Sequence, residues 1–97
     1  MLARVARYGL PPDRSDEAVE AFITSAQEIA AMEGFDRGYL LVDSETGMTV
    51  TLTLWENQAT LDASSTTAAL ARRRAVDSVE GEVEWVQVFD VVREFGE

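Results

Sequence analysis

The sequence predicts an α+β domain with the element order β-α-β-β-α-β. Residues 49–55 alternate between threonines and aliphatic residues, which is the period of two that is typical of a strand. Residues 15–33 instead place apolar residues at helical spacing, and a second helical stretch precedes a last alternating segment at 83–92. Only turn residues separate 37–42 from the next alternating run, so these two strands form an antiparallel hairpin. We expect one four-stranded antiparallel sheet with both helices on one side.

The first strand is expected at residues 2–8, where Gly9 and two prolines stop it. Ser15 is the expected N-cap of the first helix, and acidic residues fill the first turn, where the helix dipole favours negative charge. The helix runs to about Glu33 and ends at Gly34, a usual left-handed C-cap. Its apolar stripe consists of Val19, Phe22, Ile23, Ala26, Ile29 and Ala30.

The strand at 49–55 has two different faces, and both are expected to be covered. One face is aliphatic, with Val50, Leu52 and Leu54, and suits a layer of helices. The other face carries threonines and ends in Trp55. It is too polar for an ordinary core and too apolar for open water, so it suits a subunit interface or a cavity.

After this strand, Asn57 is placed to cap a short helix. A cluster of hydroxyl residues at 64–67 is expected to break that helix and to cap a second one, and Gly81 ends this region. In the last strand, at 83–92, the alternation separates two sets of residues. One face carries Val86, Val88 and Val92, and the other carries Trp85, Gln87, Phe89 and Val91.

This element order is that of a ferredoxin-like fold, which leaves one side of the sheet without helices. An aromatic-rich patch on a bare sheet is seldom exposed in a monomer, so we expect a homodimer in which two sheets pack across a two-fold axis. The residues expected on the bare side are Arg4, Ala6, Tyr8, Tyr39, Leu41, Thr51, Thr53, Trp55, Trp85, Gln87, Phe89 and Val91. The expected dimer-interface residues are Thr51, Thr53, Trp85, Gln87 and Phe89.

Composition excludes several classes of function. The 97 residues fit a single domain, 1–97. A net charge of −10 opposes nucleic-acid binding, which needs a positive surface. The chain has no histidine and no cysteine, and its acidic residues follow no metal-ligating spacing, so no metal site is expected. No apolar run is long enough to span a membrane and the N-terminus lacks a signal-peptide core, so we expect a cytoplasmic protein.

Two short motifs carry a resemblance to a known family. The run MEGFDRGYLL at 32–41, then a hairpin, then LTLWEN at 52–57, resembles the antibiotic biosynthesis monooxygenase (ABM) superfamily. Gly-Phe at 34–35 and Trp-Glu at 55–56 recur across that superfamily. The resemblance implies a dimeric α+β barrel. It also implies one of several activities, since members include cofactor-independent quinone-forming monooxygenases, haem-degrading enzymes and isomerases.

The sequence departs from the haem-degrading relatives. Those relatives carry an asparagine on the first strand, a second tryptophan about two helical turns after the third strand, and a histidine late in the last helix. Here the first strand holds Arg4, Ala6 and Arg7, and the other two positions fall near 63–64 and 73–74, which lack these residues. The resemblance therefore does not extend to haem degradation.

The cofactor-independent members imply an oxidoreductase that uses neither metal nor flavin, because the substrate itself supplies electrons to oxygen. Such an enzyme needs an apolar pocket, a donor for a developing phenolate and exclusion of water. The implied substrate is a small aromatic or polyketide-like compound. The candidate ligand-binding residues are Tyr8, Tyr39, Trp55 and Arg74, and the further candidate donors are Arg4, Arg7 and Trp85.

Each candidate also has a purely structural interpretation. A tryptophan at a strand end packs in the core, a buried tyrosine finds a backbone partner, and Arg74 fits a solvated helix face. The absence of histidine and of a catalytic constellation supports a second class of function. In that class the chain is a non-catalytic dimeric module that binds a small hydrophobic molecule or serves assembly alone. Sequence leaves both classes open.

Overall fold

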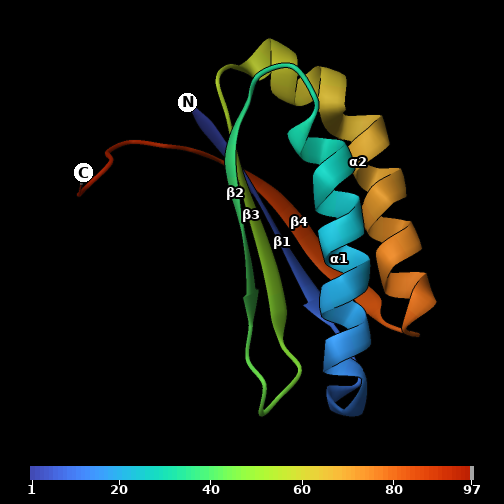
Figure 1. The fold of residues 1–97 in the computed structure, drawn as a ribbon. Coiled ribbons are helices and arrows are strands. Elements are labelled where there is room, and N and C mark those ends of the chain that lie inside the picture. Colours follow the sequence, from blue (N-terminus) through green and yellow to red (C-terminus); the bar gives the residue numbers. More distant parts are fainter. Residues whose placement is uncertain (97) are drawn as a thin grey trace.

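The computed structural model describes residues 1–96, apart from the side chain of Ser15. Four antiparallel strands form one sheet in the order β2-β3-β1-β4. Both helices cover the same face of this sheet, and the opposite face is bare (Figure 1). The predicted ferredoxin-like arrangement is confirmed. Its elements are β1 (Leu2–Gly9), the 3₁₀ turn η1 (Pro12–Arg14), α1 (Ser15–Ala30), β2 (Phe35–Val42), β3 (Thr49–Trp55), α2 (Gln58–Ser78) and β4 (Glu82–Asp90).

Helix α1 differs from the prediction at both of its ends. Arg14, rather than Ser15, occupies the N-cap position, and the helix ends at Ala30. A turn follows instead of the last predicted helical residues, and Gly34 adopts a φ of 83° at its end. Glycine is also required there for space, because a Cβ at Gly34 would overlap the side chain of Thr60 at the start of α2.

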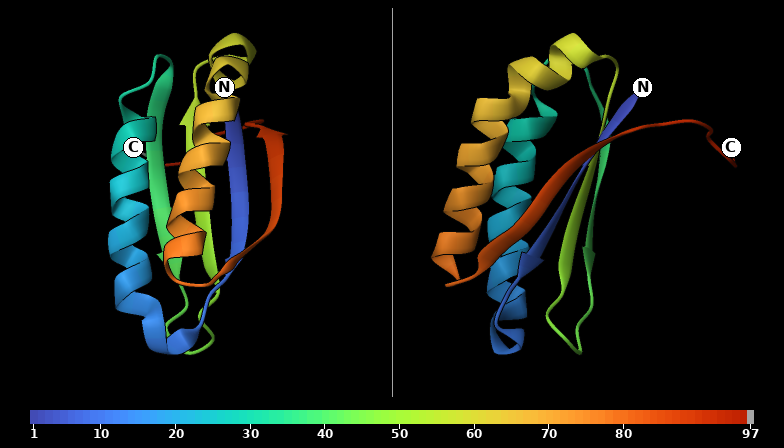
Figure 2. Two further views of the ribbon diagram at one scale, coloured as in Figure 1. Left: turned by 90° about the vertical axis from the view of Figure 1, so that its right-hand side faces the viewer. Right: turned by 180° about the vertical axis from the view of Figure 1, so that it is seen from behind.

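Helix α2 is continuous, so the predicted break at 64–67 is wrong. Ser64 Oγ and Ser65 Oγ both donate to the carbonyl oxygen of Leu61, at 2.7 Å and 3.2 Å. These hydroxyls bond within the helix and do not interrupt it, and the first turns of α2 run at an angle to the rest (Figure 2). The predicted cap is confirmed, since Asn57 Oδ1 accepts from the backbone N–H of Thr60 at 2.9 Å.

Replacing Asn57 by alanine is expected to lower the free energy of unfolding by about 1 kcal/mol, because the N–H of Thr60 loses its acceptor. Urea unfolding followed by circular dichroism measures the effect. The matched control is Asn57→Asp, which keeps an acceptor oxygen and should unfold close to the unaltered protein. Equal midpoints for the alanine and aspartate variants would show that this cap does not stabilise α2.

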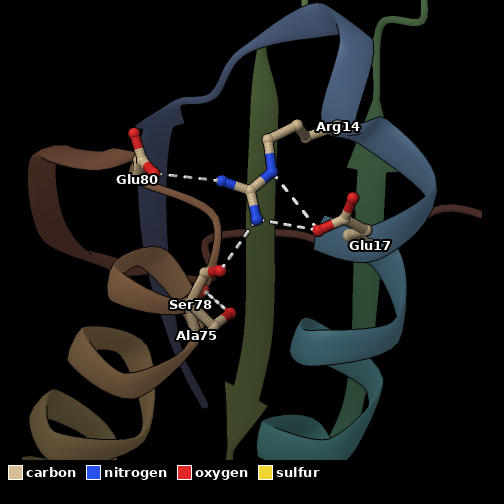
Figure 3. A network of polar contacts seen from close by, with 5 residues as sticks. All are labelled: Arg14, Glu17, Ala75, Ser78 and Glu80. Carbon is tan, nitrogen blue, oxygen red and sulfur yellow. Dashed lines mark hydrogen bonds and ion pairs between the residues drawn. The ribbon is translucent and has the colours of Figure 1, made fainter.

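Arg14 joins the two helices at one end of the molecule (Figure 3). Its Nη2 donates to Glu17 Oε2 at 2.8 Å and to the carbonyl oxygen of Ser78 at 3.2 Å. Its Nη1 lies 3.5 Å from the carboxylate of Glu80, just beyond α2. One side chain therefore links the start of α1 to the end of α2.

Two apolar clusters fill the layer between sheet and helices. In one, the ring of Tyr8 packs against Phe22 with centroids 4.7 Å apart, beside Val76 of α2. In the other, Trp55 lies edge-on to Phe35 with centroids 5.6 Å apart. Tyr8 and Trp55 are both 0% exposed. They lie toward opposite ends of the sheet, so each holds one end of the helix layer.

The faces of β1 and β3 are the reverse of those predicted. Ala6 and Trp55 are completely buried beneath the helices. Directly opposed residues share a face, so the pairing of Arg4 with Thr53 places these two on the helix side as well. The residues predicted for the bare side but found beneath the helices are Arg4, Ala6, Tyr8, Thr51, Thr53 and Trp55. The residues of β3 that project from the bare side instead, where they are half-buried, are Val50, Leu52 and Leu54.

The bare side of β2 and β4 agrees with the alternation. Tyr39 lies opposite Leu52, and Gln87 lies opposite Val5, so these residues share one face. The large apolar residues there are 40% to 52% exposed. We call this surface the outer face, and its large apolar members are Val5, Tyr39, Leu41, Val50, Leu52, Leu54, Trp85 and Phe89.

Candidate functional site: a cavity between sheet and helices

A cavity of about 440 Å³ lies between the helix side of the sheet and the two helices. This volume is within the range of small-molecule sites, which are mostly apolar with a few placed polar groups. The residues that line it are Arg4, Tyr8, Phe22, Ile23, Ser25, Ala26, Gln27, Ile29, Ala30, Phe35, Gly38, Tyr39, Leu40, Thr51, Thr53 and Arg72.

The cavity has an open end and a closed end. Ile23 and Gln27 of α1 and Gly38 of β2 are exposed, so the mouth lies between α1 and the edge strand β2. Arg4 and Tyr8 are buried and come from β1, an inner strand, so they lie at the closed end. A ligand that enters past α1 would therefore meet its polar partners deep in the cavity.

The guanidinium of Arg4 is buried and only partly satisfied. Arg4 is 5% exposed. Its Nη2 donates to the carbonyl oxygen of Leu61 at 3.0 Å and to Ser65 Oγ at 3.1 Å, and its guanidinium carbon lies 5.5 Å from the ring centroid of Trp55. Within the described residues, Nη1 has no hydrogen-bond partner. Burial, and then the charge of Arg72, lower the pKa of Arg4 from its ordinary value.

Tyr8 supplies a neutral hydroxyl to the same end of the cavity. Its oxygen lies 3.0 Å from Thr51 Oγ1, and either atom can donate. Burial raises the pKa of Tyr8 above its ordinary value, so the hydroxyl keeps its proton at neutral pH. When Thr51 donates to Tyr8, the Tyr8 proton is free to be donated into the cavity.

Arg72 enters the cavity from α2. It is half-buried, and burial lowers its pKa. Among the described residues it forms no ion pair with a carboxylate. The sequence contains the signal for this placement, because Arg72 lies four residues after buried Ala68 and four before buried Val76. The candidate predicted from this helix was Arg74, two residues further along, and Arg72 was not named.

The predicted ligand-binding residues lie in four different environments. Tyr8 lines the closed end of the cavity. Tyr39 borders the mouth, but its position opposite Leu52 directs its ring to the outer face. Trp55 is buried behind the cavity against Arg4. Arg74 lies on the surface, where it donates to both carboxylate oxygens of Glu28 at 3.1 Å, so the structure does not bring it to the other three.

Thr51 and Thr53 line the cavity and do not lie on the outer face as predicted. Their hydrogen bonds explain why a face of threonines can lie beneath the helices, where Thr51 and Thr53 are half-buried. Thr51 bonds with the Tyr8 hydroxyl, and Thr53 Oγ1 accepts from the indole N–H of Trp55 at 2.9 Å. The alternation of β3 allowed either a subunit interface or a cavity for this face. For Thr51 and Thr53 the structure shows the cavity.

Two further properties concern the described chain, residues 1–96. No three histidine, cysteine, aspartate or glutamate side chains come together there in a group that could hold a metal ion. None of the helices in this range is both long and apolar enough to cross a membrane.

The fold and the cavity together define a small α+β domain with a ligand-sized site beneath its helices. Residues 1–76 match the family model for antibiotic biosynthesis monooxygenases, and the chain belongs to that family. No curated protein matches the chain with statistical significance.

Solved structures of the same fold cover nearly the whole chain. SnoaB, a cofactor-independent oxygenase from Streptomyces nogalater, is 18% identical over 99% of this chain and 97% of its own, with a TM-score of 0.78. A proposed antibiotic biosynthesis monooxygenase from Deinococcus radiodurans is 11% identical over 100% and 98%, with a TM-score of 0.80. Rv0793 from Mycobacterium tuberculosis is 18% identical over 98% of each chain, with a TM-score of 0.73. At these identities the likeness shows the fold alone.

Proposed function

We propose that the protein is a cofactor-independent oxygenase that oxidises a small phenolic aromatic compound in the cavity. The observation that supports this most is that Tyr8, with its hydroxyl, and Arg4, whose Nη1 has no partner among the described residues, both line the closed end of a mostly apolar cavity. Such donors stabilise negative charge that develops on a bound phenol, and an apolar enclosure strengthens them by excluding water. Membership of the family and the likeness to SnoaB support the same reaction class.

The reaction proposed balances without an external reductant. A ring CH₂ flanked by phenolic rings loses a proton, and the resulting anion gives electrons to O₂. A carbon–oxygen bond forms, and the hydroperoxide on that carbon then loses water to leave a ketone. One O₂ is consumed, one oxygen atom enters the product and the other leaves as water. Water accepts the proton from the CH₂, and a proton from water returns to the peroxide anion to give the hydroperoxide. The cationic groups of Arg4 and Arg72 favour the anionic form of the substrate by lowering its pKa.

The direct test uses 1,8-dihydroxyanthrone as the probe. Dissolved oxygen and the absorbance of the quinone product are followed with and without the protein, since this compound also oxidises slowly alone. The proposal expects a protein-dependent rate with one O₂ consumed for each quinone formed. Oxygen uptake no faster than the protein-free rate, across a panel of phenolic anthrones and naphthols, would contradict it.

Tyr8→Phe is expected to lower kcat by about 100-fold, because one preorganised donor to the developing oxyanion is lost. Thr51→Val is the comparison, since it removes the same hydrogen bond but keeps the Tyr8 hydroxyl. Each change should lower the free energy of unfolding by about 1 kcal/mol, but only the first should abolish most turnover. Equal losses of turnover in the two variants would show that the bond serves packing and that Tyr8 is not the donor.

One observation favours the second class of function, a non-catalytic binding module. Among the residues of the described chain that line the cavity, none is a carboxylate or a histidine, so none of these side chains is an ordinary general base. In this alternative the same aromatic probes bind in the cavity, as measured by calorimetry, and no oxygen is consumed.

We further propose that the protein forms a homodimer through the outer face. Its aromatic and aliphatic side chains are 40% or more exposed at Tyr39, Leu41, Trp85 and Phe89. Contiguous apolar surfaces of this kind mark interaction sites, and two copies of one sheet face can pack against each other about a two-fold axis. Of the five predicted interface residues, Trp85, Gln87 and Phe89 lie on this face.

A further inference from the structure

We propose that the cavity is selective for a monoanionic aromatic ligand whose carboxylate is held between Arg4 and Arg72. This inference rests on the proposed function and uses the same cavity: the carboxylate takes the two arginines, and the Tyr8 hydroxyl remains the donor to the phenolic oxygen. It concerns recognition and does not require oxidation. Three features of the described residues carry it: the fixed position of Arg4, the lack of an ion pair to either arginine, and the mostly apolar walls around them.

The free nitrogen of Arg4 cannot easily turn toward another partner. The other end of the guanidinium is held by the carbonyl oxygen of Leu61 and by Ser65 Oγ, and its plane lies near the ring of Trp55. Nη1 is thus presented at a fixed place. A buried cationic nitrogen without an acceptor is unfavourable, and a bound oxyanion would relieve that cost.

The two cavity arginines differ from most of the others in this chain. Of the six other arginines within residues 1–96, five lie within 4 Å of a carboxylate; they are Arg7, Arg14, Arg37, Arg73 and Arg74. Arg4 and Arg72 have no such partner in the described chain, although acidic residues outnumber basic ones by 18 to 8. An acidic protein that leaves these two cations unpaired retains a local site for an external anion.

Local charge favours a monoanion. Arg4 and Arg72 both line the cavity, and the lining residues within the described chain include no carboxylate. Asp62, an exposed residue of α2 outside the lining, offsets part of this positive charge. A single negative charge on the ligand therefore suits this end of the cavity. A carboxylate has this charge, and its two oxygens can accept from two guanidinium groups at once.

The rest of the cavity suits an aromatic ring. Phe22, Ile29, Phe35 and Leu40 line it and offer only hydrocarbon. A ligand of the expected kind would place its ring against these residues and its carboxylate at the closed end.

The test compares 1-naphthoate with 1-naphthamide, a neutral compound of nearly the same shape, by calorimetry. Neither probe has an oxidisable ring CH₂, so the result does not depend on turnover. The unaltered protein is expected to bind the acid at least 10-fold more tightly than the amide. Arg72→Gln should remove this preference by weakening the acid about 10-fold or more while the amide is unchanged. Arg73→Gln, which removes the same charge from the neighbouring exposed position, should leave both affinities as they were.

Several outcomes would overturn the inference. If the unaltered protein binds 1-naphthoate and 1-naphthamide equally, or binds neither, the carboxylate site is contradicted. If folded Arg72→Gln still prefers the acid to the amide, the site is also contradicted. The same holds if Arg73→Gln loses as much affinity for the acid as Arg72→Gln does, because the loss would then reflect the overall charge of the protein. The result is separable from the proposed function. Naphthoate selectivity without oxygen uptake contradicts only the oxygenase, and oxidation of neutral anthrones without acid selectivity contradicts only the carboxylate site.

Discussion

Replacing Trp55 with alanine is expected to lower the free energy of unfolding by about 3–5 kcal/mol, as large buried side chains do when they are truncated. Trp55 is 0% exposed, packs edge-on against Phe35 and lies opposite Leu2 in the sheet. It also supports the guanidinium of Arg4. Because small domains are stable by only about 5–15 kcal/mol, the variant should unfold at a much lower urea concentration.

Leu70→Ala is the control for this change. Leu70 is a large apolar residue of α2 that is 59% exposed, so its truncation should alter the free energy of unfolding by no more than about 0.5 kcal/mol. Circular dichroism is the suitable probe, because its signal comes from the backbone. The fluorescence signal would differ between the variants, since the Trp55 variant loses one of the two tryptophans. An unfolding midpoint for the Trp55 variant close to that of the Leu70 variant would show that Trp55 is not a core anchor.

Replacing Trp85 with glutamate is expected to dissociate the proposed homodimer. Trp85 is 40% exposed on the outer face, beside Arg7 of β1 in the sheet register. Aromatic residues at the centre of an interface typically contribute about 2 kcal/mol or more, and a charge buried there without a partner adds to the loss. The dimer dissociation constant should therefore rise by at least about 30-fold. Light scattering at micromolar protein should report the monomer mass for this variant and the dimer mass for the unaltered chain.

Leu70→Glu is the matched control for assembly. It introduces the same charge at an apolar residue on the opposite side of the molecule, and the mass should stay that of a dimer. A monomer mass for the unaltered protein would contradict the outer face as a self-association surface. An unchanged dimer mass for the Trp85 variant would place the contact elsewhere.

The sequence was sufficient for the order of elements, the hairpin and the Asn57 cap because these depend on local interactions. Period-two alternation identifies which residues share a face, but it does not say which face meets the helices. The aliphatic face of β3 was assigned to the core because it is the more hydrophobic one. The threonine face meets the helices instead, and its hydroxyls find partners in Tyr8 and Trp55. The sequence does not place these partners together.

The candidate site was predicted only in part. Tyr8 was named from its residue type, although it was assigned to the wrong face. Arg72 was distinguishable from Arg74 by helical spacing, since buried residues lie one turn before it and one turn after it, whereas Arg74 has a buried residue only on its N-terminal side. The unpaired nitrogen of Arg4 was not predictable, because it depends on how Leu61, Ser65 and Trp55 meet the guanidinium in three dimensions.

The two-sided character of β3 has a consequence for protein engineering. Thr51 and Thr53 border the cavity, whereas Val50, Leu52 and Leu54 reach only the outer face. Alternate positions of this one strand therefore affect two separate features of the molecule, the ligand site and the outer face. A library restricted to positions 51 and 53 would reshape the ligand site and leave the outer face intact, and one restricted to the positions between and beside them would do the reverse.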